Sequence, residues 1–325
     1  MAIPTSLRSS LALTAEQATA VLWAAVAIAE SDGAAIGQRT AELLDTASHG
    51  LEVVLEPWMK TRSLPGNLGE VFPSAKERRH LVDALILVVC IEGEVQPRRQ
   101  RALVELAAAL GVRSHWVTLL DAFAHRRLFT IKRALGTRSP DVRRLFSRVW
   151  REEGLLGMLR ALWFVMGFYR DRQLAARFHA LERLAPGTFG RAIFDHCDTR
   201  HIPFPGDKGG MPERMMHHDL MHVLNGFDTD AAGECEIAGF YAGFTDGDSF
   251  TFIMTVLATF QLGLEVSPAV VKPDRGAFRP ARVLRAYLRG RQLTIDVMGP
   301  WDYWELMPLS LAEAQARLGL PPGQG

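Results

Sequence analysis

Two histidines and an aspartate lie at helical spacing in the segment Met-Met-His-His-Asp-Leu-Met-His, which begins at Met215. His218 and His222 are four residues apart, and Asp219 and His222 are three apart, so on a helix these side chains are neighbours. Imidazole nitrogens combined with a carboxylate suit zinc, iron or manganese, whereas magnesium prefers oxygen ligands. The segment therefore predicts a metal site carried by one helix.

A further ligand is expected on the helix that follows this segment. Gly226 and the polar stretch 228–230 predict a turn of the chain. A new helix that begins near Ala231 places Glu234 in its first turn, where the carboxylate can point back toward the same ion. We therefore predict one metal centre with four ligands: His218, Asp219, His222 and Glu234.

The role of Asp219 and the identity of the metal stay open at this point. Zinc is the metal we expect, with iron and manganese as alternatives. If all four residues bind, a tetrahedral structural zinc site is complete, whereas an Asp219 that only orients a histidine leaves one position for water or substrate. His217 lies about 100° around the helix from His218, so we expect it at the surface or facing a substrate. We expect Glu236 to be solvated.

The elements that position these residues are predicted to be helices, because apolar runs recur without a convincing run of alternating strands. The N-terminal part repeats one order of features: a helix, an acidic turn and a second helix. The first copy spans 15–30, 31–33 and 38–47, and the second spans 81–91, 92–94 and 98–110. Thr14 and Gln17 form a capping-box pattern, and Pro97 and Gly111 suit the two ends of the last helix. We predict an all-α fold.

The N-terminal repeat resembles the TerB-like family, named for tellurite resistance, over about residues 12–130. The alanine-rich helices and the turn Ser31-Asp32-Gly33 carry the resemblance, which implies a TerB-like helical bundle. Arg39 and Arg98-Arg99 stand where members of that family often carry acids. A basic linker is expected over 131–144, because glycine, serine and proline punctuate the stretch 136–140.

The C-terminal part resembles the coenzyme Q (ubiquinone) biosynthesis family often called Coq-four, over about residues 145–322. The family signature is His-Asp-x-x-His, eleven residues and Glu, with a glycine just before the Glu, here Gly233. Four more segments resemble the family: Pro186 to Arg191, Glu213-Arg214, Tyr287 to Gly290 and Trp301 to Glu305. The resemblance implies an all-helical domain with its metal site beside a hydrophobic cavity for an isoprenoid tail.

The same resemblance implies a function in ubiquinone biosynthesis. The protein would bind a metal and a prenylated quinone precursor, as a scaffold of the pathway, in oxidative decarboxylation of the ring, or both. Its expected partners are a polyprenyl or quinone lipid, other ubiquinone-pathway proteins and a membrane surface. A homodimer is compatible with this role, and no nucleic acid is expected. Whether the protein turns over a substrate stays open, so no catalytic or cofactor-binding residue is assigned beyond the metal ligands.

The composition is that of a globular protein, with 48% hydrophobic and 22% charged residues and a net charge of +1 over 325 residues. Three scattered cysteines predict no disulfide framework, and neither a secretory signal nor an uninterrupted spanning segment is evident. The stretch 126–151 carries nine Lys or Arg and one acid, and an apolar run follows at 155–169. This combination suits peripheral attachment to anionic lipid, which places the protein in the cytoplasm at the inner membrane. A core helix beside a solvated linker is the alternative.

Two other functions are compatible with the metal motif. An HD-type hydrolase would use His218-Asp219 as a doublet, with His196 or His201 and Asp246 converging on it. A non-catalytic adaptor would use the metal only as a structural element. A zincin-type protease is disfavoured, because that motif requires a glutamate where Asp219 stands.

Overall fold

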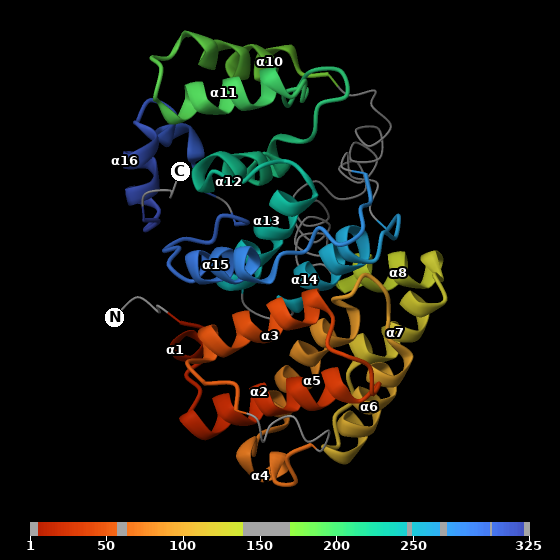
Figure 1. Ribbon diagram of the computed structural model, residues 1–325. Helices are drawn as coiled ribbons and strands as arrows, with labels where there is room; N and C mark the ends of the chain where they lie inside the picture. The colour runs from red at the N-terminus through yellow and green to blue at the C-terminus, as the bar shows by residue number, and fades with distance from the viewer. Residues whose placement is uncertain are drawn as a thin grey trace. The chain divides into compact units, whose positions relative to one another are not determined.

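The computed structural model describes residues 6–56, 64–138, 170–245, 249–266, 272–299 and 301–321. Over these ranges the regular secondary structure is helical, and two isolated β-bridges, Thr188 with Ser310 and Leu262 with Arg275, are the exceptions (Figure 1). The predicted all-α fold is therefore confirmed. The finer assignment to TerB-like and Coq-four-like domains remains a prediction.

The chain divides by its internal contacts into two compact units. The first unit combines residues 1–137 with 230–291, and the second combines 138–229 with 292–325. The domains predicted from the sequence, 12–130 and 145–322 with a linker at 131–144, stay a prediction. A division by internal contacts does not test where such domains begin and end along the chain. The units themselves are not successive along the chain, since 230–291 groups with the N-terminal helices.

The first unit contains the repeated helix pairs and three helices from later in the sequence. Its helices are α1 (Leu7–Ser10), α2 (Ala15–Glu30), α3 (Gln38–Leu51), α4 (Leu68–Val71), α5 (Ala75–Cys90), α6 (Pro97–Ala109), α7 (His115–Ala124), α8 (Leu128–Arg138), α13 (Ala231–Phe244), α14 (Phe250–Val256) with its π-helical continuation η4 (Leu257–Gln261), and α15 (Pro280–Gly290). The Thr14–Gln17 capping box and Pro97 in the first turn of α6 are confirmed. Helix α5 begins earlier than predicted because Ser74 forms a capping box with Glu77.

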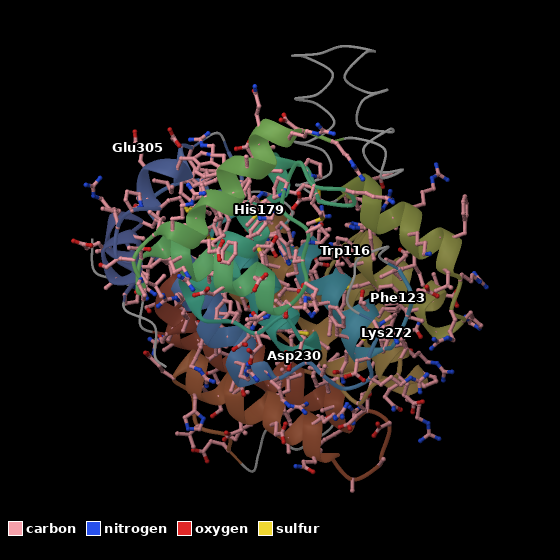
Figure 2. All side chains as sticks on the ribbon, turned by 90° about the horizontal axis from the view of Figure 1, so that it is seen from above. Trp116, Phe123, His179, Asp230, Lys272 and Glu305 are labelled. Atoms are coloured by element: carbon pink, nitrogen blue, oxygen red, sulfur yellow. The ribbon has the colours of Figure 1, made fainter. Side chains whose placement is uncertain are left out.

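The apolar faces of these helices form the core of the first unit. Leu22 and Ile28 of α2 and Ile86 of α5 are fully buried. Trp116 and Phe123, labelled in Figure 2, contribute the aromatic side chains of α7 to this core. Burial of such large apolar groups is the main favourable term that holds helices of this kind together.

A buried polar network joins the two acidic turns of the repeat. Asp32, in the turn after α2, accepts a hydrogen bond from Nε of Arg99 on α6 at 2.9 Å. Glu92, in the turn after α5, accepts from the amide and the hydroxyl of Thr40 on α3 at 3.0 and 2.6 Å. Arg99 also donates to the Thr40 hydroxyl at 2.9 Å, and only 2% of Arg99 is exposed. Each acidic turn is therefore held by the second helix of the other copy.

Replacing Arg99 with methionine is expected to lower the free energy of unfolding by about 3 kcal/mol, because it leaves the Asp32 carboxylate largely buried without its ion-pair partner. Urea denaturation followed by circular dichroism measures this loss. The exposed Arg101, on the same helix, is the matched control, and its methionine variant should stay within about 0.5 kcal/mol of the wild type. A loss below about 1 kcal/mol at Arg99 would show that the network contributes little.

Helices α13 and α15 form the most extensive helix pair of the described chain, and glycines make the contact. A Cβ added at Gly239 would lie 2.7 Å from the carbonyl oxygen of Val283, and one at Gly243 would clash with the carbonyl oxygen of Tyr287. Gly290 of α15 approaches the Phe240 carbonyl as closely from the other side. Because glycine has no side chain, the two backbones approach directly, as in small-xxx-small helix pairs.

Gly243→Ala is expected to destabilise the protein by at least about 2 kcal/mol, because the added methyl group must push α15 away from α13. The control is Gly136→Ala in α8, where an added Cβ meets nothing within 4 Å. That variant should gain about 0.5–1 kcal/mol from helix propensity alone. Thermal and urea unfolding of both variants check the contrast, and equal effects at the two glycines would contradict it.

The second unit contains shorter helices. They are α10 (Arg172–His179), the 3-10 helix η2 (Ala180–Arg183), α11 (Phe189–Thr199), the 3-10 helix η3 (Glu213–Met215), α12 (His217–Asn225), the 3-10 helix η5 (Tyr303–Leu306) and α16 (Leu311–Arg317). Ser310 and Glu313 form a capping box at the start of α16. Gln315 of α16 donates to the carbonyl of Leu224 at the end of α12, at 2.8 Å. This bond anchors the C-terminal end of the helix that carries the histidines.

Candidate metal centre

Helix α12 presents His218 and His222 on one face, as the spacing predicted. The Nε2 atoms of the two rings are 3.2 Å apart, and the ring planes are nearly perpendicular, at 77°. At a metal–nitrogen distance of about 2.1 Å, two nitrogens with this separation subtend roughly 100° at the ion. The histidine pair therefore fits two adjacent positions of a tetrahedral or octahedral ion.

A hydrogen bond to the backbone sets the orientation of His222. Its Nδ1 lies 3.2 Å from the carbonyl oxygen of Phe227, and because a carbonyl only accepts, Nδ1 carries the proton. The helix ends at Gly226, whose φ of 69° turns the chain so that Phe227 reaches back to the ring. His222 is 1% exposed. The proton on Nδ1 leaves a lone pair on Nε2, which is the atom that would face an ion.

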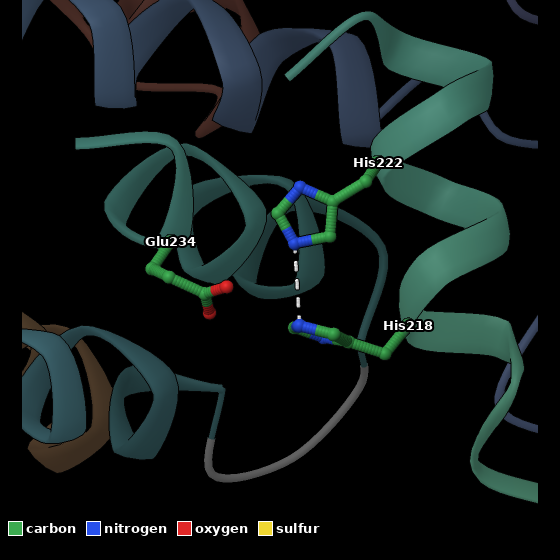
Figure 3. A group of neighbouring side chains, drawn as sticks. All are labelled: His218, His222 and Glu234. Atoms are coloured by element: carbon green, nitrogen blue, oxygen red, sulfur yellow. Dashed lines mark hydrogen bonds between the residues drawn. The ribbon is translucent and has the colours of Figure 1, made fainter. Parts of the chain in front are cut away.

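Glu234 completes a group of three candidate ligands. Helix α13 begins at the predicted Ala231, and the Asp230 side chain caps it by accepting from the amide of Gly233 at 2.7 Å. Glu234 lies in the first turn, and the ligand atoms of His218, His222 and Glu234 all lie within 4.8 Å of one another. Figure 3 shows both rings and the carboxylate directed toward a common point. The three residues could hold a metal ion.

Asp219, the remaining predicted ligand, lies outside this group of three. Its Oδ1 lies 4.0 Å from Nε2 of His196, and its side chain is largely buried. Its assignment as a ligand therefore stays a prediction.

His196 is a member of this neighbourhood that the ligand prediction did not include. It lies on the buried face of α11 together with Ile193 and Cys197. Its ring stands 6.0 Å from that of His222, at an interplanar angle of 27°. Burial, the positive charge of Arg200 and the nearby imidazoles lower the pKa of His196 to about 4. The sequence signal was a histidine on the apolar face of an amphipathic helix, which by itself also describes an ordinary core residue.

Glu236 was expected to be solvated, and this was wrong: it is buried and accepts from Nε and Nη2 of Arg282 at 3.0 and 2.6 Å. The physical reason is that α13 packs against α15 on the side where Glu236 projects, so the carboxylate needs a partner there. His217 is half-buried and His201 is exposed, while Asp246 lies outside the described residues.

A polar and aromatic cluster holds the segment that leads into α12. Glu213 Oε1 accepts from the hydroxyl of Tyr303 at 2.9 Å and from Nε1 of Trp304 at 3.0 Å. The guanidinium of Arg177 lies 3.7 Å from the centre of the Trp304 ring, a cation–π contact. Burial and the adjacent Glu213 carboxylate raise the pKa of Tyr303 well above its usual range. The C-terminal Trp-Asp-Tyr-Trp segment thus acts locally by fixing the start of the histidine helix.

Comparisons with known proteins give no family for this chain: no family model, no curated protein and no solved structure matches it. Among the helices that the structure describes, none is long and apolar enough to cross a membrane. Lipid contact was predicted for the basic stretch 126–151 and the apolar run 155–169. Of these, residues 139–169 lie outside the described residues.

The burial of His196 predicts a specific loss of stability in acid. The folded ring takes up a proton only near pH 4, whereas an unfolded chain protonates it near pH 6.5. The unfolded state binds the extra proton between these values, so stability should fall by up to about 3 kcal/mol as the pH drops through this window. His196→Gln should abolish this part of the pH dependence, and the exposed His201→Asn should retain it. Urea unfolding of chelator-treated protein between pH 7 and 4 measures the free energy of unfolding at each pH. Identical pH profiles for the wild type and His196→Gln would contradict the prediction.

Proposed function

We propose that the protein is a metal-dependent member of the ubiquinone pathway that binds a prenylated quinone precursor. The observation that supports this proposal best is the convergence of His218, His222 and Glu234 within 4.8 Å. The signature that resembles the Coq-four family contains the same three residues at the same spacing. A His-x-x-x-His pair that occurs by chance is not expected to lie beside a carboxylate of the next helix.

The donor set suits an ion that also binds substrate. Two imidazoles and one carboxylate leave coordination positions open, as in catalytic zinc sites and in non-haem iron oxygenases. A bound metal would supply Lewis-acid polarisation of an oxygen on the substrate ring. The chain contributes the orientation of the donors, through the Phe227 carbonyl on His222 and the Asp230 cap on the helix of Glu234. This set is compatible with oxidative replacement of a ring carboxyl group by hydroxyl, and equally with a protein that holds the precursor for partner enzymes.

The surface of α8 supports attachment of the protein to a lipid bilayer. Phe129 is 81% exposed, and Lys132 and Arg133, three and four residues later, are exposed on the same face. An exposed aromatic ring beside cationic side chains suits the interface of an anionic membrane, where the ring enters the headgroup region. A polyprenyl substrate is mostly hydrocarbon, so access to it requires such a surface.

An HD-type hydrolase is a second candidate, and the position of His196 favours it. This upstream histidine lies beside Asp219 of the His-Asp doublet, as that function requires. The downstream acid, Asp246, lies outside the described residues. Metal-dependent hydrolysis of bis(4-nitrophenyl) phosphate by the purified protein, lost in Asp219→Ala, would favour this candidate over the ubiquinone pathway.

The test of the proposed function combines metal content with co-purifying lipid. We expect near-stoichiometric zinc, iron or manganese in the wild type, with less than about one tenth of it in His222→Ala and Glu234→Ala, because loss of one of three ligands removes most of the binding free energy. Elemental analysis measures the metal, and mass spectrometry of solvent extracts measures prenylated quinones. His201→Asn and the exposed Glu305→Ala are matched controls that should keep the metal. Metal without lipid would favour the hydrolase or the adaptor, and protein without metal would remove the basis of the site.

A further inference from the structure

A groove on the first unit is formed by α6, α7 and the turn that joins them, whose helices are labelled in Figure 1. Its volume is about 620 Å³, which lies within the range of about 300–1,000 Å³ found for pockets that hold small molecules. The metal centre uses none of the residues that line it. The groove is therefore a candidate for a second binding site.

One part of the groove is apolar. Val104 of α6 is 45% exposed, and Ala108, one turn further along the same helix, is exposed beside it. Ala107, Val112 and Val117 complete the apolar lining. A ligand that covers these side chains removes apolar surface from water, which is favourable. From Val104 to Ala108 the helix rises by roughly 6 Å, so this part fits a short aliphatic chain.

The other part of the groove is cationic. Arg113 is an exposed lining residue. His115, also in the lining, has its Nδ1 3.5 Å from Nη2 of Arg79, whose side chain is 45% exposed. Helix α7 begins at His115, so the positive end of its dipole lies at the same place. No acidic residue belongs to the lining in the described part of the chain. This end of the groove favours an anionic group.

Asp83 lies near the cationic end, where the protein itself engages its carboxylate. The Asp83 side chain is 10% exposed and lies 3.7 Å from Nε of Arg79. It also accepts a hydrogen bond from the hydroxyl of Ser114 at 2.5 Å. One buried acid therefore faces two partly exposed cations, Arg79 and Arg113, and the balance at this end stays positive.

We propose that the groove between α6 and α7 binds a short aliphatic carboxylate. The chain lies on Val104, Ala108 and Val112, and the carboxylate lies at the end formed by Arg113 and His115. A single carboxylate matches the single positive charge in excess there, and the apolar part matches an unbranched chain. This inference concerns the first unit alone, so it is independent of the metal centre and of the proposed function.

The experiment titrates the full chain, with its valine methyl groups labelled for NMR, with octanoate and with octanol. The two probes share the same aliphatic chain and differ in charge. We expect octanoate to shift the methyl signals of Val104, Val112 and Val117 in a saturable way. Octanol should bind about threefold more weakly, because it lacks the electrostatic attraction to the partly exposed cations.

Two pairs of exposed residues provide matched variants. Ala108→Trp should weaken octanoate binding more than about tenfold, because the indole occupies the groove, whereas Ala109→Trp, outside the lining on the same helix, should bind like the wild type. Arg113→Gln should weaken octanoate about threefold and leave octanol unchanged, and Arg101→Gln is its control. Thermal unfolding shows whether each variant folds, and if Ala108→Trp does not, Arg113→Gln carries the comparison.

Several results would overturn the proposal. The first is the absence of shifts at the three valines with millimolar octanoate, and the second is equal affinity for octanol and octanoate. Equal losses in folded Ala108→Trp and Ala109→Trp would place the probe elsewhere. Shifts of the same methyl groups that depend on protein concentration alone would identify a second copy of the chain as the occupant. Each of these results leaves the metal centre and the proposed function untouched.

Discussion

The close approach of α13 and α15 constrains much of what the first unit can do. Where Gly239, Gly243 and Gly290 meet the facing backbone there is no space for a side chain, so the two helices have essentially one way to pack. That packing determines which acidic side chain of α13 is buried against α15. Glu236 projects toward α15 and is paired with Arg282. Glu234, two residues earlier, belongs to the group with His218 and His222 that could hold a metal ion.

The buried network around Arg99 shows how one buried cation can link the two copies of a helical repeat. Asp32 and Glu92 occupy equivalent acidic turns, and their carboxylates meet donors from the opposite copy. Arginine is well suited to this position, because its planar guanidinium donates to several acceptors at once and remains charged when buried. Arg98 and Arg99 of α6 thus link the second copy to the acidic turn of the first. The acids of these turns are engaged by the protein itself.

The second unit orients its histidine helix by packing and by hydrogen bonds that side chains donate to backbone carbonyls. Phe227 defines the tautomer of His222, Gln315 holds the end of α12, and the Glu213 cluster holds its beginning. A ligand whose ring is held in place before an ion arrives loses little conformational freedom on binding. The cost is a buried histidine beside the site, because burial lowers the pKa of His196 to about 4.

Much of the local structure is determined by the sequence alone. The capping boxes at Thr14 and Ser310, the turn at Gly226 and the start of α13 follow from residue types within a few positions of each other. The meeting of His218 with His222 follows from the pitch of one helix, and that pitch also brings Asp219 near them. Only the tertiary structure decided that Glu236 is buried, that His196 stands beside Asp219, and that 230–291 packs with the N-terminal helices. These outcomes depend on contacts between residues far apart in the chain, and the periodicity of a helix specifies which face is apolar without specifying what will cover it.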